Sequence, residues 1–106
     1  MEKDRQMINV DFPTPGEILR KEFMEPLGLS VNKLANETAV SWARIHRILD
    51  GKTKMTADMS ARLSEYFGLN REFWTDLQEL YDARVTERMN AVKSEAIHFA
   101  MATQRK

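Results

Sequence analysis

Residues 30–54 read SVNKLANETAVSWARIHRILDGKTK and contain two short helical patterns separated by a few residues. Ser30 and Ser41 each stand just before one pattern, where a serine hydroxyl can cap the free N–H groups of a helix. The first helix should end near Thr38, and the second should run from Trp42 to about Asp50, because the next residue is a glycine. Apolar residues recur at helical spacing in both: Val31, Leu34 and Ala35, then Ile45, Ile48 and Leu49.

Two short helices with so brief a connection are typical of a helix-turn-helix, whose second helix faces base edges in the major groove of DNA. Charge supports this interpretation. Residues 30–54 hold five basic and two acidic residues, whereas residues 55–86 hold three basic and six acidic ones, although the net charge of the chain is zero. We therefore expect double-stranded DNA to bind at residues 30–54.

The candidate DNA-binding residues follow from the same helical geometry. With its apolar residues inward, the second helix turns outward Ser41, Trp42, Ala43, Arg44, His46 and Arg47. Arginine suits the O6 and N7 atoms of guanine, and the basic loop Lys52, Thr53, Lys54 suits phosphates. Ser30 and Asn32 lie at the start of the preceding helix, whose N–H groups can meet a phosphate. Trp42 has two open roles, packing on the helix of residues 31–38 or contacting a thymine methyl or sugar.

Helical patterns continue on both sides of this segment. Further helices are expected over about residues 15–24, ended by Pro26 and Gly28, between Thr56 and Gly68, from Asn70 to about Tyr81, and beyond Arg84. No alternating pattern indicates a strand. The chain is therefore predicted to be all-α, with a flexible tail at residues 1–13, a helix-turn-helix domain at residues 14–84 and a C-terminal helix at residues 85–106.

Composition excludes several classes of protein. A chain of 106 residues has the size of one domain, and the absence of cysteine excludes disulfides, thiol catalysis and cysteine-ligated zinc. No apolar run has the length of a membrane helix and no signal-peptide core is present, so a cytoplasmic protein is expected. No catalytic or phosphate-binding motif occurs, and the two histidines have no neighbouring ligands. We expect no enzymatic activity, no cofactor and no metal.

Two apolar stripes suggest assembly. The fifth helix offers more apolar side chains than one small core needs, which places a homodimer interface at Phe73, Trp74, Leu77 and Tyr81. The last helix carries a narrow stripe with alternating spacings of four and three, formed by Val85, Met89, Val92, Ala96 and Phe99. This helix either docks on its own domain or on the partner subunit, or it orders fully only when a partner protein binds.

Several motifs spread over residues 13–84 closely resemble HigA-type antitoxins of the Xre helix-turn-helix group. They are PGEIL at residues 15–19, PLGLS at 26–30, the spacing IxxIxxGK at 45–52, TAD at 56–58, YFG at 66–68 and EFWxxLQxxYD at 72–82. The resemblance implies a lambda-repressor-like fold of five helices with a C-terminal extension. It also implies a homodimer that represses its own operon and neutralises, by binding, a cognate toxin that cleaves mRNA on the ribosome.

Three positions depart from the pattern of that family. Thr14 stands where histidine is frequent, Ala39 stands where the interhelical turn usually has glycine, and Val31 stands where related repressors place a glutamine that contacts phosphate. Alanine adopts a positive φ only at a cost, so the turn either differs or holds modest strain. Two alternative functions stay open: a stand-alone transcriptional regulator of the same group, and a protein-binding antitoxin with little DNA binding.

Overall fold

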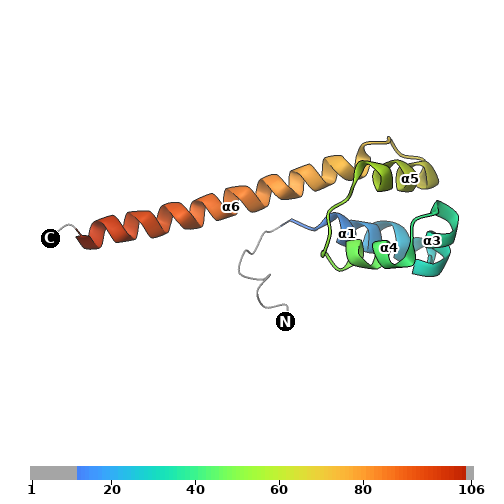
Figure 1. Cartoon of the computed structure of the whole chain (residues 1–106), viewed down its shortest axis with the longest axis horizontal. Helices are drawn as coiled ribbons and strands as arrows, with labels where there is room; N and C mark the ends of the chain where they lie inside the picture. Colours follow the sequence, from blue (N-terminus) through green and yellow to red (C-terminus); the bar gives the residue numbers. More distant parts are fainter. Residues whose placement is uncertain (1–11, 105–106) are drawn as a thin grey trace. The chain divides into compact units, whose positions relative to one another are not determined.

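The computed structural model describes residues 12–104, and every regular element in this range is a helix (Figure 1). The pieces α1 (Pro15–Ile18), η2 (Leu19–Met24) and α2 (Glu25–Leu27) follow one another without a break and form the first helix. The others are α3 (Val31–Thr38), α4 (Trp42–Leu49), α5 (Ala57–Phe67) and α6 (Phe73–Gln104). The expected all-α fold with a five-helix domain and a C-terminal helical extension is confirmed for the described residues. The tail expected over residues 1–13 lies outside them, except for its last two residues.

The first helix continues through Pro26, beyond its expected end at Met24. Proline has no N–H and its ring clashes with the carbonyl four residues earlier in a regular α-helix. The preceding turn is a wider π-turn, in which the N–H of Glu25 bonds to the carbonyl of Arg20, five residues back. The wide turn accommodates the proline, and the helix ends instead at Gly28, whose φ of 65° is left-handed.

The core takes one fully buried side chain from each of the five helices. These side chains, all 0% exposed, are Leu19, Leu34, Ile45, Leu63 and Trp74. The indole of Trp74 also packs against the ring of Phe23, with centroids 5.1 Å apart. The helix-turn-helix pair is thus fixed in the same core as the helices before and after it.

Gly16 sets the distance between the first helix and α4. A Cβ atom at this residue would lie 2.0 Å from the carbonyl oxygen of Ile48, far inside van der Waals contact. Glycine is therefore required for the two backbones to meet. The close approach holds the C-terminal end of α4 against the start of the chain's first helix.

Helix α6 is continuous, whereas the sequence predicted a separate final helix beyond Arg84. Residues 82–84 include neither glycine nor proline, so nothing local ends the helix there. Contacts divide the described chain into one unit of residues 13–81 and a second unit of residue 12 with residues 82–104. In the second unit the guanidinium of Arg84 lies 5.0 Å from the ring centroid of Phe12. No helix within the described range has both the length and the apolar character needed to cross a membrane.

Candidate DNA interface

Helices α3 and α4 begin at the two predicted serine caps. The hydroxyl of Ser30 accepts the N–H of Lys33 at 3.1 Å, and that of Ser41 accepts the N–H of Arg44 at 3.2 Å. Each serine has extended backbone angles, as an N-cap requires. Both caps are confirmed, and they fix where the two helices of the motif begin.

The turn between these helices depends on Ala39. Its φ of 62° and ψ of 28° are left-handed, and its N–H bonds to the carbonyl of Ala35 at 3.0 Å. The next residue, Val40, is almost fully buried and anchors the turn in the core. Of the two alternatives left open by the sequence, the chain therefore keeps the turn expected for glycine and accepts the strain of an alanine in it.

Helix α4 has the predicted inward and outward faces. Ile45, Ile48 and Leu49 are buried, whereas Ser41, Ala43 and Arg47 are exposed. Trp42 is 52% exposed and its ring stacks on the half-buried ring of His46 one turn later, with centroids 4.1 Å apart. Trp42 thus stands at the surface of the motif rather than inside the core. No group of three or more histidine or acidic side chains that could hold a metal occurs in the part of the chain that the structure describes.

Arg44 is half-buried and its side chain leans toward α5. Its Nη2 atom donates to Oγ1 of Thr56 at 3.5 Å, and the same hydroxyl accepts the N–H of Met59 as the N-cap of α5. Sequence reasoning missed this link between α4 and α5, because it forms only when the two helices pack together. The position of the arginine head is therefore coupled to the start of the next helix.

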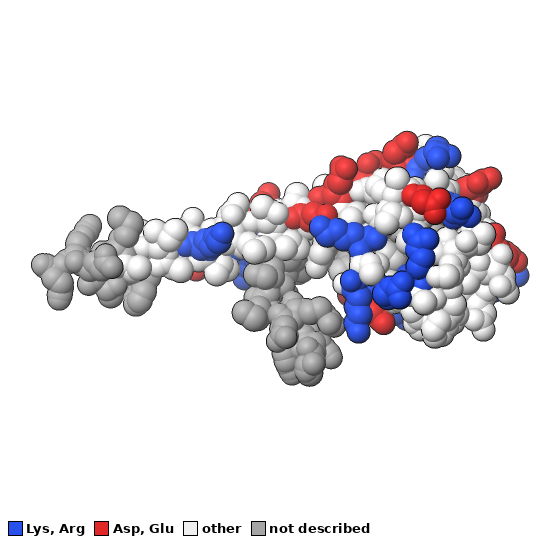
Figure 2. Space-filling model, in the orientation of Figure 1, with Lys and Arg blue, Asp and Glu red and all other residues white. Residues whose placement is uncertain are grey.

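The basic loop between α4 and α5 is exposed and is held at its far end. Lys52, Thr53 and Lys54 are all exposed, and the N–H of the next residue, Met55, donates to Oε1 of Gln78 at 2.8 Å. Figure 2 shows basic side chains gathered over α4 and this loop, and acidic ones over α5 and the start of α6. The charge asymmetry predicted from the sequence is thus a surface feature of the fold. The positioning role of Gln78 carried no local sequence signal.

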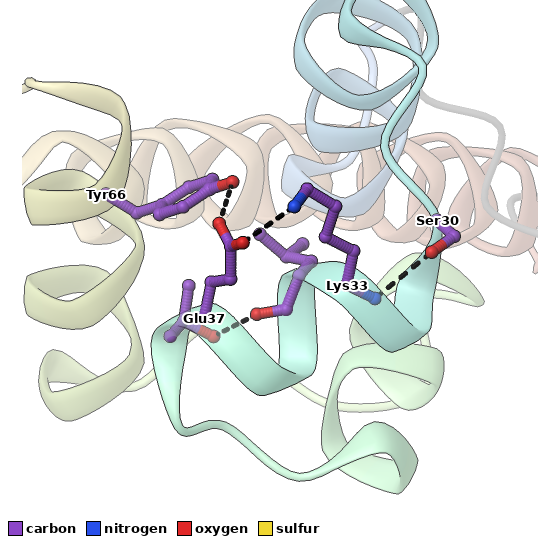
Figure 3. A network of polar contacts seen from close by, with 6 residues as sticks. Ser30, Lys33, Glu37 and Tyr66 are labelled. Carbon is purple, nitrogen blue, oxygen red and sulfur yellow. Dashed lines mark hydrogen bonds and ion pairs between the residues drawn. The ribbon is translucent and has the colours of Figure 1, made fainter.

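A polar cluster joins α3 to α5 (Figure 3). Nζ of Lys33 lies 2.7 Å from Oε2 of Glu37, and the hydroxyl of Tyr66 donates to Oε1 of Glu37 at 2.6 Å. The hydrogen bond from Lys33, followed by that from Tyr66, lowers the pKa of Glu37, and the same contacts with Glu37 raise the pKa of Lys33 and of Tyr66. The cluster therefore ties the first helix of the motif to the helix that follows the motif. Ser30 and Asn32 are exposed at the other end of α3.

The residues expected at a dimer interface differ in exposure. Trp74 is 0% exposed within its own chain, so its side chain packs in the core and offers no surface to a partner. Phe73 and Leu77 are half-buried and pack against the core, while Tyr81 is half-buried. Much of the apolar face of this helix thus packs in the core of the domain.

Comparison with known proteins places the fold and the motif among helix-turn-helix proteins, although no protein-family model matches the chain. Virulence-associated protein I of Dichelobacter nodosus is 42% identical over 74 residues, covering 70% of this chain and 68% of that protein. Antitoxin HigA-1 of Vibrio cholerae is 32% identical over 72 residues, covering 65% of this chain and 68% of that protein. The structure of Pseudomonas aeruginosa antitoxin HigA with the higBA promoter has a TM-score of 0.71 at 33% identity, covering 79% of this chain and 91% of that one.

Proposed function

This chain belongs to the HigA family of helix-turn-helix proteins, and we propose that it is a cytoplasmic antitoxin that represses its own operon. It binds operator DNA as a homodimer and neutralises a cognate toxin by direct contact. The observation that carries the proposal is the exposed outward face of α4, continued by the basic loop, on a family fold that has been solved with promoter DNA. The protein acts by binding and performs no catalysis of its own.

Each basic residue of the interface has a distinct role. Arg44 and Arg47 lie one turn apart on α4 and supply the donors that guanine edges or neighbouring phosphates accept. Lys52 and Lys54 neutralise phosphates and fix the register of the protein on the duplex. Trp42, exposed at the start of α4, contacts a thymine methyl or a sugar.

A homodimer places two copies of α4 in successive major grooves, about 34 Å apart, so the operator is a palindrome. A two-fold protein matches two-fold DNA because the same residues read both half-sites. The zero net charge of the chain limits non-specific attraction to DNA, which leaves the local basic surface to supply the phosphate contacts.

Binding to the DNA upstream of the chain's own gene tests the proposal. Fluorescence anisotropy should give tight binding to this DNA and weak binding to a scrambled duplex, and Arg47→Ala should weaken the specific complex about tenfold or more. Arg71→Ala is the matched control, because Arg71 is exposed but lies in the acidic segment of residues 55–86. Equal loss from both variants, or no preference for the upstream DNA, would refute the DNA-reading role.

Toxin binding is tested separately. The product of a neighbouring open reading frame should arrest growth when expressed alone, and co-expression of this chain should restore growth and yield a co-purified complex. DNA binding without any such partner would favour the stand-alone regulator, which uses the same interface. A complex with the partner but no operator binding would favour the protein-binding antitoxin.

A further inference from the structure

In the second unit of the chain, helix α6 carries an apolar stripe along one face. Val85, Met89, Val92 and Ala96 follow one another at spacings of four, three and four residues along α6. Met89 is 44% exposed, Val92 is 48% exposed, and Ala96 is exposed as well. These spacings are those of the seam in a two-stranded coiled coil, with Met89 and Ala96 at a positions and Val85 and Val92 at d positions.

Charged residues flank this seam, and they distinguish the possible directions of a partner helix. Arg88 and Glu95 each precede an a position and so lie on one side of the seam. Thr86 and Lys93 each follow a d position and lie on the other side. In coiled coils these flanking residues face the partner helix and set its orientation.

A parallel pair of α6 helices would bring like charges together. In that arrangement a residue before an a position faces the residue five places further along the other helix, so Arg88 would face Lys93 of the second copy. The symmetry of the pair repeats this repulsion on the opposite side. The charged residues that flank the seam therefore disfavour the parallel orientation.

An antiparallel pair is complementary in shape and charge. It places Met89 against Val92 of the second copy, and Val85 against Ala96 of the second copy. Each layer therefore pairs a larger side chain with a smaller one. It also brings Arg88 opposite Glu95 of the second copy, twice by symmetry, while Lys93 faces the neutral Thr86.

We propose that residues 85–96 of α6 pair with the same residues of a second copy of this chain in an antiparallel two-helix coil. This inference rests on the proposed function, which requires a homodimer. It adds the surface that forms the dimer and the orientation of the two helices. The two-fold axis crosses the pair near residues 90 and 91. At a rise of 1.5 Å per residue the two copies of Asp82 lie about 26 Å apart along the coil, and the assembly has the closed symmetry that a palindromic operator needs.

Charge reversal in the full chain tests the orientation. In the antiparallel pair Arg88→Glu and Glu95→Arg each replace two attractions by two repulsions, so each should raise the dimer dissociation constant about tenfold in sedimentation equilibrium. In a parallel pair Arg88→Glu would instead face Lys93 of the second copy and strengthen the dimer. Stronger dimerisation of this variant would overturn the proposal.

Two controls separate pairing from folding. The double variant R88E/E95R restores both attractions, and an equimolar mixture of the two single variants forms a complementary heterodimer, so both should return to within about twofold of the wild-type dissociation constant. Circular dichroism should show the same helix content in all variants. Failure of both rescues, or a wild-type chain that is monomeric at about 100 μM, would overturn the proposal and leave the stripe to another partner.

Cross-linking gives an independent result, because the natural chain has no cysteine. A tagged Val85→Cys chain is mixed with an untagged Ala96→Cys chain and treated with a short bismaleimide. The antiparallel pair yields cross-links between the two different chains, whereas a parallel pair yields only links between identical chains, which would contradict us. If pairing fails while Arg47→Ala still weakens binding to the upstream DNA, this inference is wrong and the proposed function stands.

Discussion

Nη2 of Arg44 lies 3.5 Å from Oγ1 of Thr56, which links α4, the helix proposed to face DNA, to the N-cap of α5. The distance is at the long end for a hydrogen bond, so the contact orients the guanidinium without holding it strongly. In the proposed complex DNA would accept hydrogen bonds from the arginine's other donors while Thr56 limits the range of positions that the side chain samples. A partly preorganised arginine loses less conformational freedom on binding.

Arg44→Ala should weaken operator binding by about 1–3 kcal/mol and relax the preference at one base pair per half-site, because a bidentate contact with guanine is lost. Thr56→Ser keeps both the cap and the hydroxyl and should bind as the wild type does. Anisotropy titrations against operators with each base pair changed in turn measure both effects. Retention of the full base preference by the Arg44 variant would assign base reading to another residue.

Lys52→Ala should weaken binding to all sequences to a similar extent, since a phosphate contact carries no sequence information. The slope of log K against log salt concentration should become shallower by about one unit, because one fewer counterion is released. Salt titrations on the operator and on a scrambled duplex provide the comparison. An unchanged slope would mean that Lys52 does not reach a phosphate.

The sequence predicted the parts of the fold that depend on neighbouring residues. Ser30, Ser41 and Thr56 cap the helices that begin beside them, and Gly68 ends α5 in the left-handed conformation. Each of these signals acts within three or four residues, so a single sequence contains all the information needed. The helix-turn-helix and its inward residues followed from the same local patterns.

The parts that the sequence did not predict depend on distant contacts or on two competing local rules. Arg44 meets Thr56 and Met55 meets Gln78 only once the helices pack together. The burial of Trp74 depends on how much of one apolar face the other helices cover, which no local pattern measures. Pro26 does not end the first helix, because the preceding π-turn leaves room for the proline ring.

Trp74→Ala should reduce the free energy of unfolding by about 3–5 kcal/mol, because it leaves a large cavity in a core to which all five helices contribute. Trp74→Phe should cost less, since it keeps part of the volume and removes an indole N–H that has no hydrogen-bond partner among the described residues. Urea unfolding followed by circular dichroism measures both variants. Equal midpoints for the alanine variant and the wild type would contradict the buried position of the indole.

Ala39→Gly should raise the free energy of unfolding by about 0.5–1 kcal/mol, because Ala39 has a φ of 62° that glycine adopts without a steric cost. The gain is partial, because glycine has more conformational freedom than alanine in the unfolded chain and loses it on folding. Ala57→Gly, in the first turn of α5, is the matched control and should lower stability. A destabilised Ala39 variant would show that the methyl group makes contacts that outweigh the strain.

The cluster of Lys33, Glu37 and Tyr66 should stabilise the domain only within a defined pH range. The pKa of Glu37 is lowered by its hydrogen bonds from Lys33 and Tyr66, so its contribution is present above the ordinary carboxyl pKa and is lost as the pH falls through the lowered value. The pKa values of Lys33 and Tyr66 are raised by Glu37, so their contributions are present below their ordinary values and are lost as the pH rises through the raised ones. The cluster is therefore fully effective between about pH 5 and pH 10.

Glu37→Gln should accordingly lower the melting temperature at pH 7 and have a smaller effect at pH 3, because the stabilising contribution of the wild-type carboxylate declines as the pH falls below the ordinary carboxyl pKa. The effect is modest because all three groups reach solvent and salt screens the ion pair, so 1 M NaCl should also narrow the difference. Lys33→Met should produce a similar loss at pH 7, and the double variant should be little worse than either single one, because both remove the same interaction. Thermal melts of the four proteins at the two pH values measure this. A difference between wild type and Glu37→Gln that is equally large at pH 3 would show that the carboxylate's charge is not what joins α3 to α5.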